Sequence, residues 1–302
     1  MQQLTIATFN CENLFMRFKF REDISKSKID DAVINGFIRN KALFTTILEK
    51  ERSLTASAIK DTGADIIGLQ EVENLDTLKS FQSQFVKKYP FQYVIDGNDP
   101  RLIDVGVLSK YEASFLKTHQ FDKNGTSKIF SRDCLEVEYD FNGTPFTLFI
   151  NHFKSMLGGR AETMNRRKAQ AEQVVKIIKN KFGNNPGNEN FAVMGDLNDY
   201  LPSAGLQPLL GQPWLENVVK TRIANTADQW THWYDNDNSV SQLDYILLSK
   251  KIANNNNTAV PVIIRKGLAK KATAYTGPRY AGVGPTRPSA SDHCPVAITI
   301  KI

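Results

Sequence analysis

Polar, chemically versatile side chains lie beside or within short apolar runs at six places spread over nearly the whole chain. The first is Asn10, after the run 4–9, and the last is the pair Asp292 and His293, just before the run 296–302. Acids, amides and imidazoles at the ends of buried strands are expensive to desolvate and need partners. We therefore expect one polar site assembled from the ends of several strands, within one domain that covers residues 1–302.

Strand-like runs mix with helical periodicity without strict alternation. We predict strands at 4–9, 65–69, 91–95, 105–108, 135–139, 146–150, 191–195, 243–248 and 296–302, and helices at 38–60, 75–88 and 160–182. The Asn142-Gly143 dipeptide between two strands is a hairpin signal, so some neighbouring strands are antiparallel. This pattern favours a mixed α/β layered fold over a doubly wound parallel sheet. Residues 16–37 read as an insertion and 265–288 as a long loop.

The composition is that of a soluble globular protein, with 302 residues, 41% of them hydrophobic and 23% charged. We expect no transmembrane helix, because no run of about 18 apolar residues occurs. No signal peptide is visible, which favours the cytoplasm, or secretion if a leader has been removed. The three cysteines, Cys11, Cys134 and Cys294, form no CxxC pair, so we expect small buried side chains rather than a zinc site or disulfides.

The net charge of +6 fits an anionic partner such as nucleic acid or an anionic lipid surface, and it fits a basic soluble surface equally well. The loop 265–288 carries six basic residues and two tyrosines, which suit phosphate contacts and base stacking. A solvated loop is the alternative. No protein partner is evident from the sequence.

Three side chains are candidate metal ligands. Glu71 directly follows a buried strand, Asp292 is a second carboxylate, and Asn10 adds an amide oxygen. Hard oxygen ligands of this kind suit Mg²⁺ or Mn²⁺ rather than Zn²⁺. Taken alone, an acid after a strand also fits a helix N-cap or a surface group.

Asp196 and Asn198 lie two residues apart after the strand 191–195. If the strand continues, this spacing puts both side chains on one face. The carboxylate can then deprotonate a water, and the amide can donate to a phosphate oxygen. An Asx turn at the end of the strand is the alternative.

Two histidines close strand-like runs. Asp244 can hydrogen-bond to one nitrogen of His293, which would fix its tautomer and raise its basicity. His152 is a second imidazole among the carboxylates. His119 and His232 have no such setting, and we treat them as bystanders.

In this order, Asn10, Gln70-Glu71, His152, Gly195–Asn198, Leu243–Tyr245 and Ser291–His293 resemble the endonuclease/exonuclease/phosphatase superfamily. The resemblance implies a DNase I-like four-layer sandwich, with two packed mixed β-sheets and helices outside. It also implies metal-dependent phosphoester hydrolysis at one end of the sandwich.

The resemblance assigns a role to each candidate. Glu71 would bind the divalent metal, which is Mg²⁺ or Mn²⁺ with Ca²⁺ as a further candidate, and Asn10 and Asp292 would lie nearby. Asp196 would position or activate the attacking water, and Asn198 would hold the phosphate.

The remaining assignments concern the leaving group and the phosphate. Asp244 would orient His293 on the scissile phosphate, and His152 would stabilise charge or protonate the leaving group. Arg132 resembles a basic residue that the DNase I-like branch aims at phosphate. Asp104 is a candidate partner of His152.

The segment 151–155 lacks the tyrosine of apurinic endonucleases, and 242–245 lacks the Trp-Cys-Asp-Arg segment of inositol phosphatases. Both segments are similar to those of bacterial extracellular, DNase I-like nucleases. We therefore predict a nuclease that cuts DNA, with RNA as a second substrate. The alternatives are a lipid or small-molecule phosphodiesterase, for which the apolar and basic segment 15–20 is a candidate contact, and a non-catalytic binding module.

Overall fold

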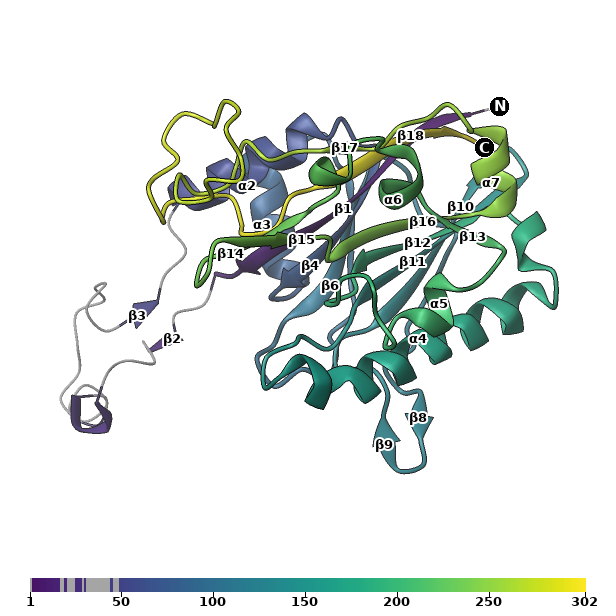
Figure 1. The fold of residues 1–302 in the computed structure, drawn as a ribbon, viewed down its shortest axis with the longest axis horizontal. Coiled ribbons are helices and arrows are strands. Elements are labelled where there is room, and N and C mark those ends of the chain that lie inside the picture. Colours follow the sequence, from purple (N-terminus) through teal and green to yellow (C-terminus); the bar gives the residue numbers. More distant parts are fainter. Residues whose placement is uncertain (1, 17–18, 21–24, 29, 31–43, 46–48) are drawn as a thin grey trace.

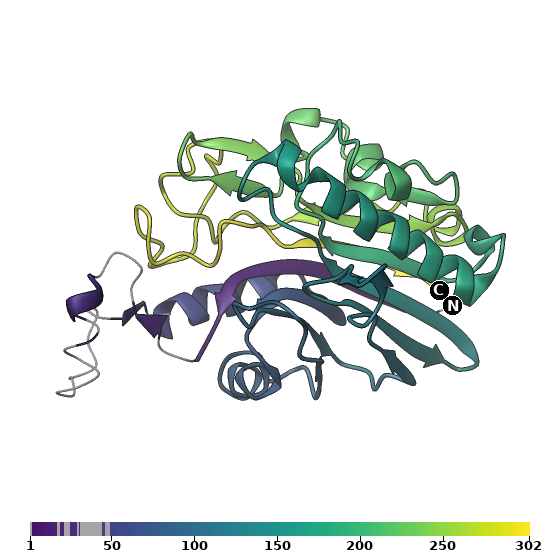
Figure 2. The same ribbon diagram turned by 90° about the horizontal axis from the view of Figure 1, so that it is seen from below.

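The chain folds into two six-stranded β-sheets that pack face to face, with helices on both outer faces (Figure 1). The computed structural model describes residues 2–16, 19–20, 25–28, 30, 44–45 and 49–302. Seen from below, the two sheets lie one above the other, with helices outside them (Figure 2). The predicted four-layer sandwich is therefore confirmed.

The first sheet has the strand order β17-β18-β1-β4-β6-β5. Its strands are β17 (Val262–Ile263), β18 (Val296–Lys301), β1 (Gln3–Leu14), β4 (Ile66–Val72), β6 (Asp104–Ser109) and β5 (Phe91–Val94). The central strands β1 and β4 are parallel, and the other described pairs are antiparallel.

The second sheet has the order β13-β16-β12-β11-β10-β7. Its strands are β13 (Leu215–Asn217), β16 (Asp244–Ser249), β12 (Phe191–Asp196), β11 (Thr144–His152), β10 (Cys134–Phe141) and β7 (Phe115–Lys117). Here β11 and β12 form the parallel pair. Asn142 and Gly143 turn the chain between β10 and β11 with φ of 57° and 81°, which confirms the predicted hairpin.

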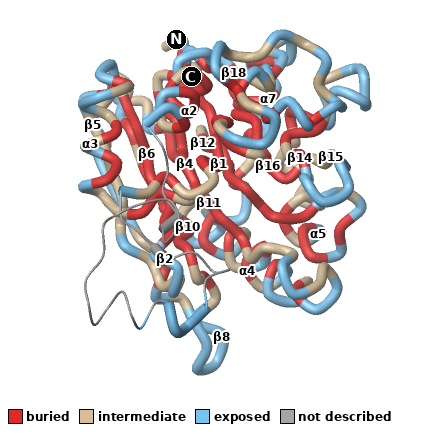
Figure 3. The backbone as a smooth tube through the Cα atoms, turned by 90° about the vertical axis from the view of Figure 1, so that its left-hand side faces the viewer, coloured by how far each residue is buried: buried red, intermediate tan, exposed pale blue. Residues whose placement is uncertain are grey.

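The central core lies between the two sheets. Ile6 and Val107 of the first sheet belong to the same buried cluster as Leu148 and Met194 of the second. Burying one such side chain contributes about 1.5–3 kcal/mol. In Figure 3 the strands are largely red, and exposed residues are concentrated in loops and at the hairpin that contains β8 (Lys123–Asn124).

Helices cover the outer faces of both sheets. The first is covered by α2 (Glu49–Asp61) and α3 (Leu75–Phe85), and the second by α4 (Arg160–Phe182) and α5 (Gln207–Leu210). On α4, Val174 and Ile178 pack into the outer core of the second sheet. The remaining helices are α6 (Val218–Arg222), α7 (Lys250–Asn255), η1 (Pro186–Asn188) and η2 (Thr226–Asp228).

Three small two-stranded sheets complete the described elements. They pair β14 (His232–Tyr234) with β15 (Ser239–Ser241), β8 with β9 (Ser127–Lys128), and β2 (Lys19–Phe20) with β3 (Phe44–Thr45). No helix or strand is assigned within 265–288, as predicted for a loop. No helix in the described part of the chain is both long and apolar enough to span a membrane.

The predicted helix boundaries were partly wrong. Within the predicted helix 38–60, the described residues form a strand at Phe44 and Thr45 and a helix that includes Glu49 and ends at Asp61. Residues 38–43 and 46–48, with most of the insertion 16–37 and part of the candidate contact 15–20, lie outside the described residues. The predicted helix 75–88 ends at Phe85, because the chain leaves helical geometry at Val86, which has φ −133°.

Candidate active site

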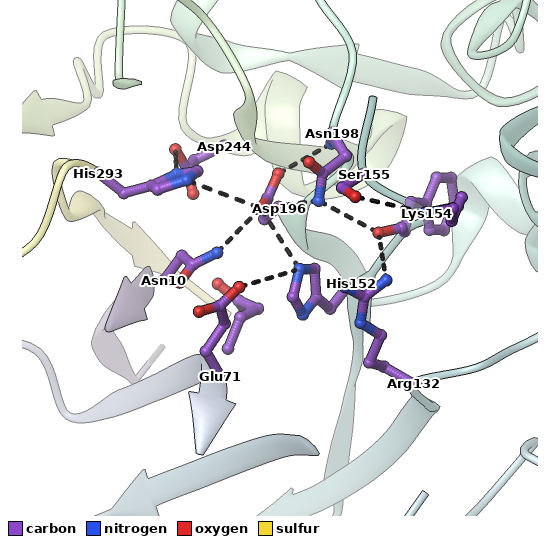
Figure 4. Close-up of polar contacts among 12 residues, drawn as sticks. Asn10, Glu71, Arg132, His152, Lys154, Ser155, Asp196, Asn198, Asp244 and His293 are labelled. Carbon is purple, nitrogen blue, oxygen red and sulfur yellow. Dashed lines mark hydrogen bonds and ion pairs between the residues drawn. The ribbon is translucent and has the colours of Figure 1, made fainter. Parts of the chain in front are cut away.

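Four central strands bring polar side chains to one edge of the sandwich (Figure 4). Asn10 and Glu71 come from the parallel pair β1 and β4, and His152 and Asp196 come from the parallel pair β11 and β12. Because parallel strands run in the same direction, each pair delivers its last side chains to the same edge. The structure thus places these four predicted residues together.

A β-bulge aims Glu71 into the site. The pairing of β4 with β6 shifts register between Gln70 and Val72, and Glu71 lies between them with φ of 63°. A bulge of this kind re-aims one side chain and is common next to active sites. Gln70 turns the other way and hydrogen-bonds to Thr8, with 3.1 Å between Nε2 and Oγ1.

Asp196 is held by two amide side chains. Its Oδ2 accepts from Asn10 Nδ2 at 3.0 Å and from Asn198 Nδ2 at 2.9 Å. Its Oδ1 accepts from the Asn198 backbone N–H at 2.8 Å. Burial raises the pKa of Asp196 to about 7, against the attraction of His293 and with a further increase from Asp244. The carboxylate is therefore poised to exchange a proton near neutral pH.

The backbone at Asp196 requires a glycine before it. Gly195 has φ of +138°, and a Cβ built there would lie 1.9 Å from the backbone oxygen of Asn151 on β11. Asn198 also has a positive φ, of 53°, and its Nδ2 additionally donates to Phe153 O at 3.1 Å. Strained backbone of this kind is common at functional sites.

His293 and Asp244 form a buried pair. His293 Nδ1 lies 2.9 Å from Asp244 Oδ2, which also accepts from Thr231 Oγ1 at 2.7 Å. Burial alone would lower the pKa of His293, but the carboxylates of Asp244 and Asp196 raise it well above 6.5. The imidazole is therefore held as a cation that can donate a hydrogen bond from Nε2.

His152 and His293 lie on different sides of Asp196 (Figure 4). The Nε2 of His152 is 3.6 Å from Asp196 Oδ2 and 4.0 Å from Glu71 Oε1. Burial, and then the positive charges of Arg132 and His293, hold the pKa of His152 well below 6.5. Its Nδ1 has no hydrogen-bond partner among the described residues.

The suggested pairing of His152 with Asp104 was wrong. Asp104 instead accepts from the backbone N–H of Gly97, with 2.7 Å between Oδ1 and N. Gly97 lies in the loop before β6, whose first residue is Asp104, and neither ring nitrogen of His152 has a contact with Asp104 among the described residues.

Besides Asp196, three carboxylates lie beside Asn10, and the sequence indicated only two of them, Glu71 and Asp292. Glu12 Oε2 accepts from the Asp292 backbone N–H at 3.0 Å. Burial, and then repulsion by Asp292, raise the pKa of Glu12 to about 8 in spite of Arg287. Burial likewise raises the pKa of Glu71, with attraction by Arg101 opposing it and repulsion by Asp292 adding to it.

These acids fit a divalent cation, because they are half-buried and repel one another. Their donors are hard oxygens, which suit Mg²⁺ or Mn²⁺. Asn10 Oδ1 accepts from the Glu12 backbone N–H at 3.0 Å, which leaves one lone pair of this oxygen for a cation. Glu12 was missed because it lies two residues beyond Asn10, where β1 shifts register between Asn10 and Leu14, and its φ is 48°.

His232, which the sequence left outside the site, lies beside Asp292 and His293 in the structure. Its Nε2 lies 3.7 Å from Asp292 Oδ2, and its ring centroid is 4.6 Å from that of His293. His119 does lie elsewhere, where its Nε2 is 3.0 Å from Glu136 Oε2.

Arg132 lies beside His152, but its guanidinium is already occupied. It is buried, forms an ion pair with Asp99 at 3.0 Å between Nε and Oδ2, and donates to Phe153 O at 3.2 Å. Arg132 therefore acts on the site through its charge and through the position of Phe153.

The fold and this edge define a class of protein, a two-sheet sandwich with buried carboxylates and imidazoles at the ends of its central strands. Residues 5–301 match the sequence model described as the Endonuclease/Exonuclease/phosphatase family, and the chain belongs to this family. Family membership indicates a phosphoric ester hydrolase that uses a divalent metal. None of the curated proteins matches the chain with significance.

Solved structures share the fold at low sequence identity. Truncated TDP2 from Caenorhabditis elegans has a TM-score of 0.62 at 14% identity, over 99% of this chain and 98% of that one. A mannosyl-6-phosphatase from Bacteroides thetaiotaomicron gives 0.60 at 16% identity, over 99% and 100%. Beta toxin from Staphylococcus aureus gives 0.62 at 16% identity, over 98% and 99%. These likenesses establish the architecture.

Proposed function

We propose that the chain is a divalent-metal-dependent phosphodiesterase that cleaves nucleic acid, with DNA as the first substrate and RNA as the second. The observation that carries the proposal is the arrangement around Asp196. A carboxylate with a pKa of about 7 lies between an imidazolium and two amide donors. A base and preorganised donors are what phosphodiester hydrolysis requires.

Each side chain has a task that follows from its contacts. Asp196 accepts the proton of the attacking water, because its pKa is close to neutral. His293, whose Nδ1 is engaged by Asp244, presents Nε2 to the negative charge that develops on the phosphate oxygens. Both protons of Asn198 Nδ2 are used, on Asp196 Oδ2 and Phe153 O, so Asn198 would donate to the same oxygens by releasing one of these bonds. Neutral His152 lies where it can interact with the leaving group. A divalent cation held by Glu71, Asn10 and Asp292 would supply Lewis-acid stabilisation of that charge.

Positive charge gathers on one side of the site. Arg101 Nη2 lies 4.0 Å from Glu71 Oε1, and Lys154 follows His152 by two residues. Burial, and then repulsion by Arg132, Arg166 and Arg101, lower the pKa of Lys154. Cations that repel one another favour a polyanionic ligand, so this side suits the phosphates that flank the scissile one.

The loop 265–288 supports this proposal less than the sequence indicated. Arg265 donates to Asp228 O and Trp230 O, and Arg279 donates to three carbonyls of its own loop. Lys266, Lys271 and Arg287 form ion pairs with Asp61, Asp235 and Glu12 respectively. Five of the six predicted phosphate-binding cations are therefore used within the protein.

The proposal is tested by incubating the protein with Mg²⁺ or Mn²⁺ and plasmid DNA, RNA, sphingomyelin or a sugar phosphate. We expect cleavage of DNA that EDTA abolishes and that falls at least about 10²-fold in Glu71→Gln and His293→Gln. Absence of metal-dependent cleavage of DNA and RNA would refute the nuclease proposal. Equal activity in both variants would refute the site.

The charged side can be tested separately. Double replacement of Arg101 and Lys154 by glutamine should weaken DNA binding, and should reduce the slope of log K against log salt by about 0.7–0.9 for each phosphate that the variant no longer neutralises. The matched control replaces the exposed Lys250 and Lys301, which lie in α7 and at the end of β18. An identical salt slope in both double variants would contradict the assignment.

A second candidate is a phosphatase or phosphodiesterase of small molecules or lipids. It is favoured by the internal use of the basic loop and by the structural likeness to a protein titled mannosyl-6-phosphatase. Release of phosphate from mannose 6-phosphate, or of phosphocholine from sphingomyelin, with no cleavage of DNA would establish it. No activity on any of these substrates would leave a non-catalytic binding module.

A further inference from the structure

Two imidazoles and one carboxylate converge next to the Asp196 centre. Among the described residues, one ligand atom from each of His232, Asp292 and His293 lies within 4.8 Å of the others. His232 Nε2 is 3.7 Å from Asp292 Oδ2, and His293 Nε2 is 4.0 Å from Asp292 Oδ1. The two oxygens of one carboxylate thus face two imidazole nitrogens.

These separations are too long for good hydrogen bonds, which span about 2.7–3.2 Å. They are close to the spacing of ligands on a shared cation. Two atoms held about 2.1 Å from a tetrahedral metal lie roughly 3.4 Å apart. The ligand atoms of all three side chains lie within 4.8 Å of one another, so side-chain movements of at most roughly 1.4 Å would bring them onto one ion.

The backbone holds the three residues in place. His232 and His293 face each other in an isolated antiparallel bridge. Trp233 N donates to Asp292 O at 3.0 Å, so the segment before β18 is tied to β14 on both sides of the bridge. Ligands on paired backbone need little reorganisation when an ion binds.

The orientation of His293 is that of a metal ligand. Its Nδ1 is 2.9 Å from Asp244 Oδ2, which leaves Nε2 for the site. Histidines that ligate metals commonly direct their other ring nitrogen to a carboxylate in this way. A metal ion at Nε2 displaces the proton that this nitrogen otherwise carries, so ion binding there and hydrogen-bond donation to a phosphate exclude each other. Asp244 itself is not a ligand of this ion, because its Oδ2 already accepts from His293 and Thr231.

We propose that His232, Asp292 and His293 form a binding site for a first-row transition-metal cation such as Mn²⁺, Co²⁺ or Zn²⁺, distinct from the oxygen site at Glu71. Two imidazoles and a carboxylate are the ligand set of several zinc and iron centres. Nitrogen ligands favour these metals over Mg²⁺, which prefers oxygen. The Asp292 carboxylate then lies between two cation sites of different chemistry.

The test titrates metal-free protein with Co²⁺ in the absence of substrate and follows its visible absorption bands. We expect one site with bands of nitrogen and oxygen ligation, and about a hundredfold excess of Mg²⁺ should leave Co²⁺ in place. His232→Phe keeps an aromatic ring against His293 but removes the ligand, and it should weaken Co²⁺ binding by at least about tenfold.

Two variants serve as controls. Tyr234→Phe alters the same strand, β14, two residues further on, and should bind Co²⁺ like the unaltered protein. Glu71→Gln should lose activation by Mg²⁺ and keep its Co²⁺ affinity. Circular dichroism and urea denaturation of the metal-free variants show whether each one is folded.

Three results would overturn the proposal. The first is unaltered Co²⁺ binding in folded His232→Phe. The second is loss of Co²⁺ binding in Glu71→Gln, which would mean one shared site. The third is a sulfur-to-cobalt charge-transfer band, which would place the ion on a cysteine such as Cys294, the neighbour of His293. Each readout is independent of substrate, so a failed nuclease assay leaves this test intact.

Discussion

Replacing Asp244 by asparagine removes a charge from the centre of the site and keeps the shape of the side chain. Thr231 Oγ1 accepts from the backbone N–H groups of Leu243 and Asp244 at 3.0 and 2.9 Å, so its own proton must go to Asp244 Oδ2. An asparagine oxygen in that position still receives the donors of Thr231 and His293. The imidazole is therefore expected to keep its place but lose its counter-charge.

The magnitude follows from the contacts. A hydrogen bond to a charged group contributes about 1.5–3 kcal/mol and a neutral one about 0.5–1.5 kcal/mol, so the change lowers the pKa of His293. Loss of this positioned cation should lower kcat about 10²–10³-fold. Asp244 Oδ1 has no hydrogen-bond partner among the described residues, so an amide there is an unsatisfied donor that destabilises the fold by about 1–3 kcal/mol.

The sign of the pH effect follows from the raised pKa of His293. The ion pair of His293 with Asp244 stabilises the protein fully at pH values below the pKa that histidine has in the unfolded chain, about 6.5. This stabilisation is lost as the pH rises through the higher pKa of His293 in the folded protein. In Asp244→Asn the loss should begin at lower pH. NMR titration of the histidine ring signals in metal-free protein measures the pKa, with His293→Gln for assignment, and urea denaturation across the pH range measures stability.

A matched control removes the same charge elsewhere. Asp235 is exposed and pairs with Lys271 at 3.4 Å. Asp235→Asn should leave both kcat and the pKa of His293 unchanged. If Asp244→Asn also leaves the pKa of His293 unchanged, or lowers kcat less than about threefold, the electrostatic account of this pair is refuted.

Three further substitutions test how the fold supports the site. Gly195→Ala places a methyl group against Asn151 O at a φ of +138°, and should destabilise the protein by more than about 3 kcal/mol in urea denaturation; a milder effect would refute the close approach. Arg167→Met removes a buried guanidinium from Asp199, 3.0 Å away, and should cost about 3–5 kcal/mol; unchanged stability would contradict the role of this pair. Glu71→Gln should abolish Mg²⁺-dependent protection in thermal denaturation while leaving metal-free stability within about 1 kcal/mol, and retained protection would place the ion elsewhere.

The sequence was informative where an apolar run ends directly in a polar residue. Glu71, His152 and Asp196 follow runs that the structure shows as buried strands, and this explains why their meeting at one edge was predictable. The hydrophobic pattern of a strand is local, and the parallel direction of the central pairs then places the ends together. The roles assigned to these side chains, and the single domain, stay predictions.

The rest depended on contacts between distant segments. His232 lies in a three-residue strand with no long apolar run, and only its bridge to His293 carries it to the site. Glu12 lies at the register shift of β1, with a positive φ, and forms an ion pair with Arg287 of the loop 265–288. Such contacts leave no periodic signal, so a histidine or acid of this kind looks like any surface residue in the sequence.

The distance between the two sheets is what allows this site to exist. A Cβ at Gly68 on β4 would lie 2.8 Å from Ile150 Cγ2 on β11, so a glycine is needed for the sheets to approach just beneath the site. The approach lets Asn10 of the first sheet donate to Asp196 of the second at 3.0 Å. Because this hydrogen bond joins the two sheets, the distance between Asn10 Nδ2 and Asp196 Oδ2 depends directly on how closely the sheets pack. The chemistry at the edge is therefore set by the core below it.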